Sequence, residues 1–253
     1  AAAGSTSAGE LANRVMRKTL EARSYTADRF KPALLDGACA AGQVELAAEN
    51  AAARTRAVDI RQACEVLRRW PNRAGADDRG ALLWDAFWTR LLDIPAKELY
   101  AQPFSTAEPL QTPSGINAAD PRVARALAAA VEDMARKGMP LDTPLGERRF
   151  VRSEGREVPL FGGCDAEGYF TVACANGGDY TMGNRSHGNT YLQVVYFDRR
   201  GVQARTLLAH GERETAVTGG KGLASVARYA KKDWLRFPFR EEDIARDPQL
   251  RRV

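Results

Sequence analysis

The 253-residue sequence has only two histidines and four cysteines, and their spacing matches no metal-binding motif. Metal sites usually draw on clustered ligands such as Cys-x-x-Cys or His-x-x-x-His. The residues concerned are His187, His210, Cys39, Cys64, Cys164 and Cys174. The sequence therefore predicts no metal site. Four cysteines without metal spacing fit either disulfides in an oxidising compartment or buried reduced thiols.

The sequence also lacks any long hydrophobic run. No stretch approaches the ~20 apolar residues of a membrane-spanning helix, so no membrane partner is expected. A start Met and a basic-then-apolar leader are absent too, and no signal peptide is visible. A processed piece of a longer precursor would lack both features.

A concentrated basic patch is missing although the formal net charge is +5. The basic residues form scattered pairs with acidic residues between them, namely Arg68-Arg69, Arg148-Arg149, Arg199-Arg200 and Arg251-Arg252. Nucleic-acid binders gather such charge in a patch or stripe with interleaved aromatic side chains. We therefore interpret the basic pairs as solvated surface and expect no nucleic-acid partner.

The first part of the chain, residues 10–140, is predicted to be mainly helical after a linker-like or frayed start at residues 1–9. Hydrophobic periodicity favours helices in several stretches. Two helices are expected to begin near Glu10 and near Thr26. Four more are expected over 43–56, 59–70, 79–92 and 121–137. The stretch 79–92 has a stripe formed by Leu83, Phe87 and Leu91, with Trp84 and Trp88 beside it, which is typical of core. Residues 101–121 are rich in Pro and are expected to form a loop.

Residues 141–253 differ, because short β-branched and aromatic runs are bounded there by Gly and Pro. Strands are expected within 148–161 and 168–178, and a hairpin is expected where 190–198 and 202–211 flank "RRG". The apolar run at 191–198 suits a strand that is covered on both faces. The tail after Lys231 has the aromatic and charged residues of a docking segment. Helices followed by strands predict an α+β fold.

Five stretches resemble the penicillin acylase family, in the branch of acyl-homoserine lactone acylases and lipopeptide (aculeacin-type) acylases. They are "LANRVMRKTLEARSYTADRF" (11–30), "CEVLRRW" with "GALLWDAFW" (64–88), "GNTYLQVVYFD" (188–198), "ARTLLAHGE" (204–212) and "DWLRFPFREEDI" (233–244). Each stretch is short, and it is their shared order and spacing along the chain that carries the resemblance. The loop 212–234 departs from the family pattern, since it lacks the Ser, Pro, His and Gln-rich composition common there.

The resemblance implies an N-terminal nucleophile hydrolase, an αββα sandwich whose precursor cuts itself into an α chain and a β chain that begins with the catalytic Ser. This chain resembles the C-terminal half of the β chain, as one segment of a single acylase domain. The nucleophile is then expected on another chain of the same precursor, in a periplasmic enzyme. The implied partners are the α chain, the N-terminal part of the β chain and a small N-acylated substrate. No cofactor is expected, and a family calcium ion would use residues of other segments.

The site residue that the resemblance carries over is Arg14, in "ANRV". It matches a family Arg that lies near the nucleophile and helps to hold the oxyanion-stabilising Asn, with a helix-surface Arg as the alternative. Ser5 and Ser7 are not expected to be nucleophiles, because a small, polar and flexible stretch surrounds them. No Gly-x-Ser-x-Gly motif accompanies His187 or His210, which are expected to be structural or exposed.

The resemblance also implies one disulfide, between Cys39 and Cys64, whose positions match a cysteine pair of this branch. A bridge there closes a loop of about 25 residues and contributes roughly 3 kcal/mol in the chain-entropy model. For Cys164 and Cys174 the sequence leaves both a second bridge and free thiols open.

The function expected from the resemblance is hydrolysis of the amide bond in N-acyl homoserine lactones, which destroys a quorum-sensing signal. The alternatives are a penicillin, cephalosporin or lipopeptide acylase of the same family, or a non-catalytic binding or structural domain. The chain alone is expected to be inactive.

Overall fold

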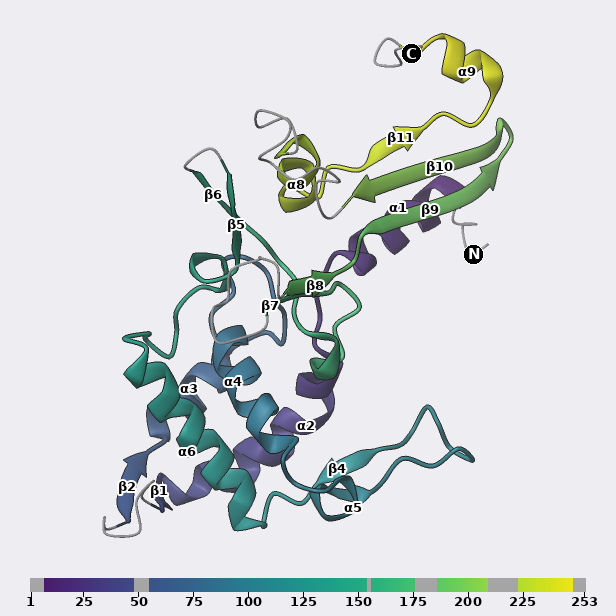
Figure 1. Cartoon of the computed structure of the whole chain (residues 1–253). Helices are drawn as coiled ribbons and strands as arrows, with labels where there is room; N and C mark the ends of the chain where they lie inside the picture. The colour runs from purple at the N-terminus through teal and green to yellow at the C-terminus, as the bar shows by residue number, and fades with distance from the viewer. Residues whose placement is uncertain (1–6, 48–54, 154–155, 176–185, 209–222, 248–253) are drawn as a thin grey trace, which may run out of the picture.

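A computed structural model describes residues 7–47, 55–153, 156–175, 186–208 and 223–247 of the chain. It confirms the α+β class: a helical body is followed in the sequence by antiparallel strands (Figure 1). The helices of the body are α2 (Tyr25–Asp36), α3 (Arg61–Arg69), α4 (Ala81–Leu91), α5 (Ala96–Leu99) and α6 (Pro121–Arg136), with a short 3-10 helix at Ala38–Ala41. Among the described helices none is long and apolar enough to cross a bilayer.

Helix α4 forms the centre of the helical body. Nine of its eleven residues are buried, and it packs along α6. The rings of Trp84 and Trp88 are stacked with centroids 5.7 Å apart, and Trp84 also contacts Trp70 at 5.9 Å. The ring of Phe30 from α2 stacks on Trp88 at 5.6 Å. The predicted aromatic stripe is therefore core, as its spacing indicated.

The helix predicted over 43–56 is wrong. Strand β1 (Gln43–Leu46) and strand β2 (Arg56–Asp59) pair there in antiparallel register, with Val44 opposite Val58. Both valines are buried, and β1 and β2 lie against α6. Helix propensity is a weak prior that tertiary packing overrides, and the Ala-rich stretch misled the prediction. Residues 48–54, half of the predicted helix, lie outside the described residues, so the correction concerns its two ends.

Two smaller differences concern the predicted loop and the first helix. Strands β3 (Tyr100–Gln102) and β4 (Ser114–Ile116) pair within the Pro-rich stretch. Helix α1 (Ala8–Thr19) begins before Glu10, because a capping box fixes its start. The Glu10 amide donates to the Ser7 hydroxyl at 3.2 Å, and the Ser7 amide donates to the Glu10 carboxylate at 2.8 Å.

The strands of the second half form small antiparallel sheets. They are β5 (Phe150–Ser153) with β6 (Arg156–Pro159), β7 (Ala173–Ala175) with β8 (Ser186–Gly188), and the order β11-β10-β9 for β9 (Tyr191–Asp198), β10 (Gly201–Leu208) and β11 (Leu235–Phe237). The predicted hairpin is confirmed, with Gly201 opposite Asp198 around the turn. Helices α8 (Leu223–Ala230) and α9 (Glu241–Ala245) flank β11, and short 3-10 helices occupy Leu145–Glu147 and Asp165–Glu167.

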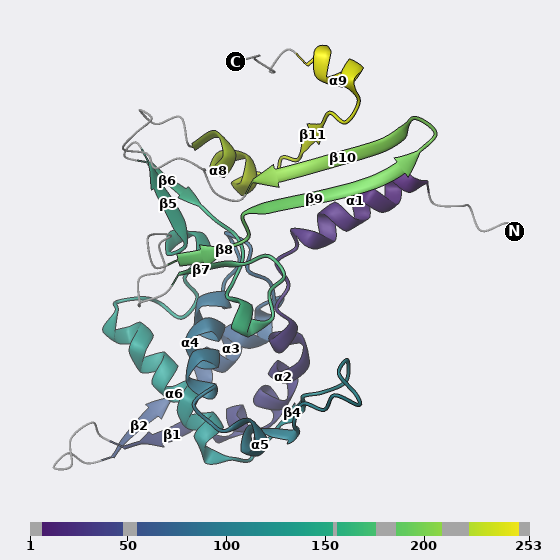
Figure 2. The same ribbon diagram turned by 45° about the vertical axis from the view of Figure 1, so that its right-hand side comes forward.

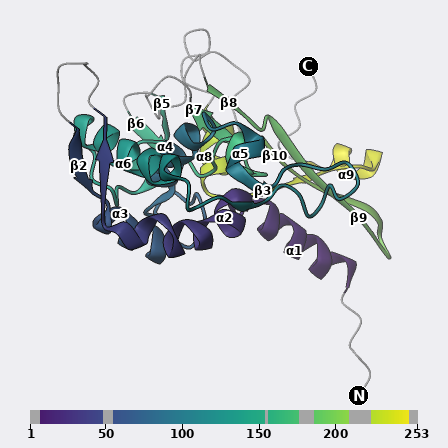
Figure 3. The ribbon, with the colours of Figure 1, turned by 90° about the horizontal axis from the view of Figure 1, so that it is seen from below.

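Strand β9 is not covered on both faces by the residues that the structure describes. Helix α1 packs along it, and the two elements extend together away from the helical body (Figures 2 and 3). Side chains at alternate positions of β9 nevertheless remain exposed: 48% for Tyr191, 47% for Val195 and 71% for Phe197. We call these three the apolar row. Leu11 and Val15 on α1 are also exposed.

Asp133 links α4 to α6 and is expected to make the fold sensitive to acid. Its carboxylate lies 3.3 Å from Arg90, 2.9 Å from Lys137 and 3.0 Å from Arg136. Burial alone would raise its pKa, but hydrogen bonds from Lys137 and Arg136 and the charge of Arg90 lower the pKa to about 2. A lowered carboxyl pKa stabilises the fold above the pKa of the unfolded chain, and this stability is lost as the pH falls through the folded value.

We therefore expect Asp133→Asn to lower the free energy of unfolding by roughly 1–2 kcal/mol at pH 7. The difference from the unmodified protein should shrink between pH 4 and pH 2, since the native carboxylate is protonated there. Urea unfolding of both proteins at several pH values measures this difference in the free energy of unfolding. Asp142→Asn is the matched control because that carboxylate lies 3.9 Å from Arg79 and is 52% exposed. An Asp133→Asn effect that stays constant down to pH 2 would contradict the role of this carboxylate.

Candidate functional site

Arg14, the site residue proposed from the sequence, lies on α1 and lines a cleft of about 1030 Å³. The cleft is bounded by α1, by residues 73–78 of the segment between α3 and α4, and by the chain that leaves α8. Phe161 and Trp234 supply apolar surface to it. Arg14 itself is exposed, so it faces solvent at the rim rather than the core.

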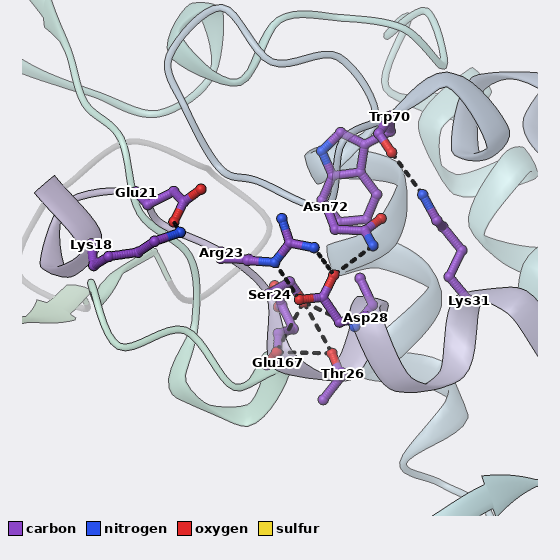
Figure 4. A network of polar contacts seen from close by, with 11 residues as sticks. Lys18, Glu21, Arg23, Ser24, Thr26, Asp28, Lys31, Trp70, Asn72 and Glu167 are labelled. Carbon is purple, nitrogen blue, oxygen red and sulfur yellow. Dashed lines mark hydrogen bonds and ion pairs between the residues drawn. The ribbon is translucent and has the colours of Figure 1, made fainter. Parts of the chain in front are cut away.

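Backbone pairing holds the wall of the cleft beside the start of α2. The Ser24 amide donates to the Asn72 carbonyl at 2.8 Å, and the Ala74 amide donates to the Ala22 carbonyl at 2.8 Å. Side chains strengthen the same junction (Figure 4): Asp28 accepts from Arg23 at 2.5 Å and from Asn72 at 2.7 Å. The cleft wall is thereby fixed to the end of α1 and the start of α2.

The charges in the cleft are partly paired. Lys18 contacts Glu21 at 2.6 Å, Arg73 lies 3.5 Å from Asp78, and the Lys232 ammonium lies 4.5 Å from the centre of the Phe161 ring. Arg14 and Arg17 have no ion pair within 4.0 Å among the residues that the structure describes. Guanidinium groups of this kind can donate several hydrogen bonds to an oxyanion or a partner carbonyl.

A buried polar cluster lies behind this region, between α4 and the strand half of the chain. Arg149, which is 1% exposed, donates to Asp85 at 2.8 Å and to the Gly162 carbonyl at 2.6 Å. Burial raises the pKa of Glu167 well above its usual value, and the charge of Asp85 and a hydrogen bond with Asp85 raise it further. Glu167 is therefore harder to ionise than an exposed glutamate, and Asp85 is the carboxyl group that contacts Arg149.

The chain around Glu167 is held to α2 by two hydroxyl groups. Ser24 donates to the Glu167 carbonyl at 3.1 Å and Thr26 at 2.8 Å (Figure 4). In the same region the Lys31 ammonium donates to the Leu67 carbonyl at 2.9 Å and to the Trp70 carbonyl at 2.7 Å. Burial lowers the pKa of Lys31 to about 8. These contacts are structural, because every acceptor is a backbone carbonyl inside the fold.

The burial of Arg149 corrects the interpretation of the Arg148-Arg149 pair as solvated surface. Only Arg148 of the two is exposed. The sequence pattern also did not predict that the acidic residues Asp85 and Glu167 are buried. Asp85 offered one signal, since it interrupts the apolar face of "ALLWDAFW"; a carboxylate inside a core helix requires a buried partner.

The serines and histidines considered as catalytic groups form no hydrolytic triad within the described residues. Ser7 caps α1, and its hydroxyl accepts the Glu10 amide. His187 on β8 lies 2.9 Å from Asp165, and its side chain is 49% exposed. Ser5 and His210 lie outside the described residues.

All four cysteines are in disulfides. Cys39 is bonded to Cys64 with a Cα–Cα distance of 5.9 Å, the pairing that the family resemblance implied. Cys164 is bonded to Cys174 with a Cα–Cα distance of 4.4 Å, which settles the pair that the sequence left open. The first bridge ties the 3-10 helix after α2 to α3, and the second ties the segment before Asp165 to β7.

Comparison with known proteins matches this sequence to an enzyme family. The family model for penicillin amidase matches residues 10–246. The acyl-homoserine lactone acylase PvdQ of Pseudomonas syringae pv. syringae (strain B728a) is 30% identical over 190 residues, which cover 73% of this chain and 24% of that protein. Aculeacin-A acylase of Actinoplanes utahensis is 28% identical over 198 residues, covering 77% of this chain and 24% of that protein.

The chain thus spans about a quarter of the length of the curated relatives that it matches. Both branches named from the sequence motifs are represented among these relatives, which confirms the resemblance. Because the family match extends from residue 10 to residue 246, this chain belongs to the penicillin amidase family.

Proposed function

We propose that this chain is the C-terminal segment of an N-acyl amide hydrolase, residues 1–253 forming part of a single acylase domain of the N-terminal nucleophile type. The observation that carries the proposal is the family match together with relatives that are named as acylases. Within the segment, residues 10–140 supply helical cover and residues 141–253 supply strands and the docking tail.

The chemistry assigned to the complete enzyme is attack by an N-terminal Ser on an amide carbonyl. The α-amino group of such a residue has a pKa near ~8, so it is partly neutral at working pH and can accept the hydroxyl proton. Backbone amides and an Asn side chain stabilise the tetrahedral oxyanion, each donor contributing roughly 3 kcal/mol. These groups are assigned to the partner chains, the α chain and the N-terminal part of the β chain.

Exposed apolar surface on β9 and α1 supports the proposal that partner chains bind here. The apolar row on β9 and the Leu11 and Val15 side chains of α1 are uncovered although they belong to the two elements that extend from the body. Contiguous apolar surface of this kind usually marks an interface. Strand β9 also lies at the edge of its sheet within the described residues, so its outer backbone groups are available for pairing.

N-acyl homoserine lactones are the proposed substrates, and hydrolysis would release the fatty acid and end a quorum-sensing signal. The support is the name of the relative at 30% identity. The alternative within the family is a lipopeptide, penicillin or cephalosporin acylase, and aculeacin-A acylase at 28% identity supports the lipopeptide choice. The two disulfides support a periplasmic location, where such bonds persist.

The proposal is tested on the protein produced from its complete gene. Intact-mass spectrometry under native and then denaturing conditions should find this sequence in a complex with a chain whose first residue is Ser. A panel of N-acyl homoserine lactones, an acylated lipopeptide and penicillin G should then show fatty-acid release from the lactones. A folded monomer without a Ser-led partner chain and without acyl release would favour a non-catalytic binding or structural domain instead.

Arg14→Ala in the complete enzyme is expected to lower kcat by about tenfold or more with a smaller change in KM. The reason is that a guanidinium near the nucleophile orients groups that act on the oxyanion. Acyl-release kinetics and precursor cleavage measure the effect. Arg17→Ala is the matched control, because Arg17 lies one turn further along α1 and lines the same cleft. Equal kinetics for the two variants would assign Arg14 to the helix surface.

A further inference from the structure

Three side chains with metal-ligating atoms, those of Asp165, Cys174 and His187, converge beside β7 and β8. The disulfide between Cys164 and Cys174 lies next to the ion pair of Asp165 and His187, in which the carboxylate and the ring nitrogen are 2.9 Å apart. One ligand atom each of Asp165, Cys174 and His187 lies within 4.8 Å of the other two. Cys164 brings a fourth ligand atom, because its sulfur is bonded to that of Cys174.

Backbone pairing holds these residues together independently of the disulfide. Cys174 and His187 are directly opposite in the β7–β8 register. The segment before Cys164 is paired as well, since the Ala173 amide donates to the Gly163 carbonyl at 3.0 Å. The Val172 amide in turn donates to the Asn189 side chain at 2.6 Å. When the S–S bond opens, this pairing keeps Cys174 opposite His187 and keeps the backbone before Cys164 beside β7.

The set of two sulfurs, one imidazole and one carboxylate is suited to zinc. Zn²⁺ takes four such ligands in tetrahedral geometry, with bonds of about 2.0–2.3 Å, so its ligand atoms lie about 3–4 Å apart. The ligand atoms here need to approach by roughly 1 Å. The site is also accessible, since the side chains of His187 and Asp165 are 49% and 70% exposed.

We propose that reduction of the Cys164–Cys174 disulfide creates a binding site for Zn²⁺ or a similar divalent metal ion. Its ligands would be Cys164, Cys174, His187 and Asp165. In the first step a phosphine or dithiol reductant is oxidised, the S–S bond breaks, and two thiols form. In the second step both thiols lose their protons to solvent as their sulfurs bind the metal ion. The disulfide and the bound metal ion are mutually exclusive states of one site, so the metal-bound form resists reoxidation.

The second disulfide supplies an internal control. Among the described residues, Asp165, Cys174 and His187 form the only group of three or more potential metal ligands that lie close together. Neither Cys39 nor Cys64 belongs to this group. Reduction of the Cys39–Cys64 bridge should therefore yield thiols without the imidazole and carboxylate partners that a tetrahedral site requires.

For the test, the protein is reduced with a phosphine, and the phosphine is then removed under anaerobic conditions. The reduced protein is titrated with Co²⁺, which serves as a spectroscopic substitute for Zn²⁺. The reduced protein should show thiolate-to-cobalt charge transfer and the visible bands of tetrahedral Co²⁺, and Zn²⁺ should abolish both. Native mass spectrometry should find one zinc ion with two protons lost. The oxidised protein should show neither signal.

Three variants decide the assignment. His187→Gln should weaken Co²⁺ binding by about 100-fold, because even the loss of an indirect partner of a metal ligand costs 10–100-fold. Asp165→Asn should also weaken binding. The double variant Cys39→Ala and Cys64→Ala should retain binding, which would show that neither of these cysteines is a ligand. Absence of the bands in the reduced protein, or binding unchanged by His187→Gln, would overturn the proposal.

Discussion

Arg149→Met is expected to lower the free energy of unfolding by about 3–5 kcal/mol, the largest effect of any charge substitution in this chain. The substitution keeps most of the side-chain volume but removes the cation that lies 2.8 Å from Asp85. Asp85, whose side chain is only 7% exposed, would then be a buried charge without a counter-ion. Urea unfolding followed by tryptophan fluorescence measures the loss.

Two further variants distinguish the ion pair from a general sensitivity of this segment. Arg148→Met changes the adjacent residue, which is exposed, and should cost less than about 0.5 kcal/mol. Asp85→Leu added to Arg149→Met should recover part of the stability, because replacement of a whole buried pair by apolar residues is often neutral. Equal losses for Arg148→Met and Arg149→Met would contradict the importance of the buried pair.

Trp84→Ala is expected to lower the free energy of unfolding by about 3–5 kcal/mol as well. Trp84 is fully buried and contacts the rings of Trp70, Phe87 and Trp88. Truncation would leave a cavity at the centre of the helical body and would remove the indole donor to the Thr26 hydroxyl, 3.1 Å away. Unfolding followed by circular dichroism measures the change without depending on tryptophan emission.

Trp234→Ala is the matched control for this prediction. Its ring is only partly buried, at the edge of the cleft, and its loss should cost roughly 1 kcal/mol. Trp84→Phe tests the two contributions separately, because it keeps an aromatic ring in the core and removes the indole donor. A Trp84→Ala protein as stable as Trp234→Ala would show that the central stack is not what holds α4 in place.

The candidate site was only partly predictable, and the difference depends on how far apart its members lie in the sequence. Arg14 could be proposed because it belongs to a short local motif shared with a family. The cleft that it lines also needs Phe161 and Trp234, which approach α1 only through the tertiary fold. The convergence of Cys174 and His187 likewise follows from the pairing of β7 with β8, which no local pattern specifies.

The sequence by itself determined the elements whose signals are local. The periodic stripe of α4, the Pro at the first turn of α6 and the two apolar runs around "RRG" indicated two helices and a hairpin, because the period of the apolar residues matches the geometry of each element. The tertiary structure alone decided that 43–46 and 56–59 pair as strands on α6, that Arg149 is buried against Asp85, and that Cys164 is bonded to Cys174. Each of these depends on contacts between chain segments distant in sequence, and burial and pairing across such distances override the preference of any single segment.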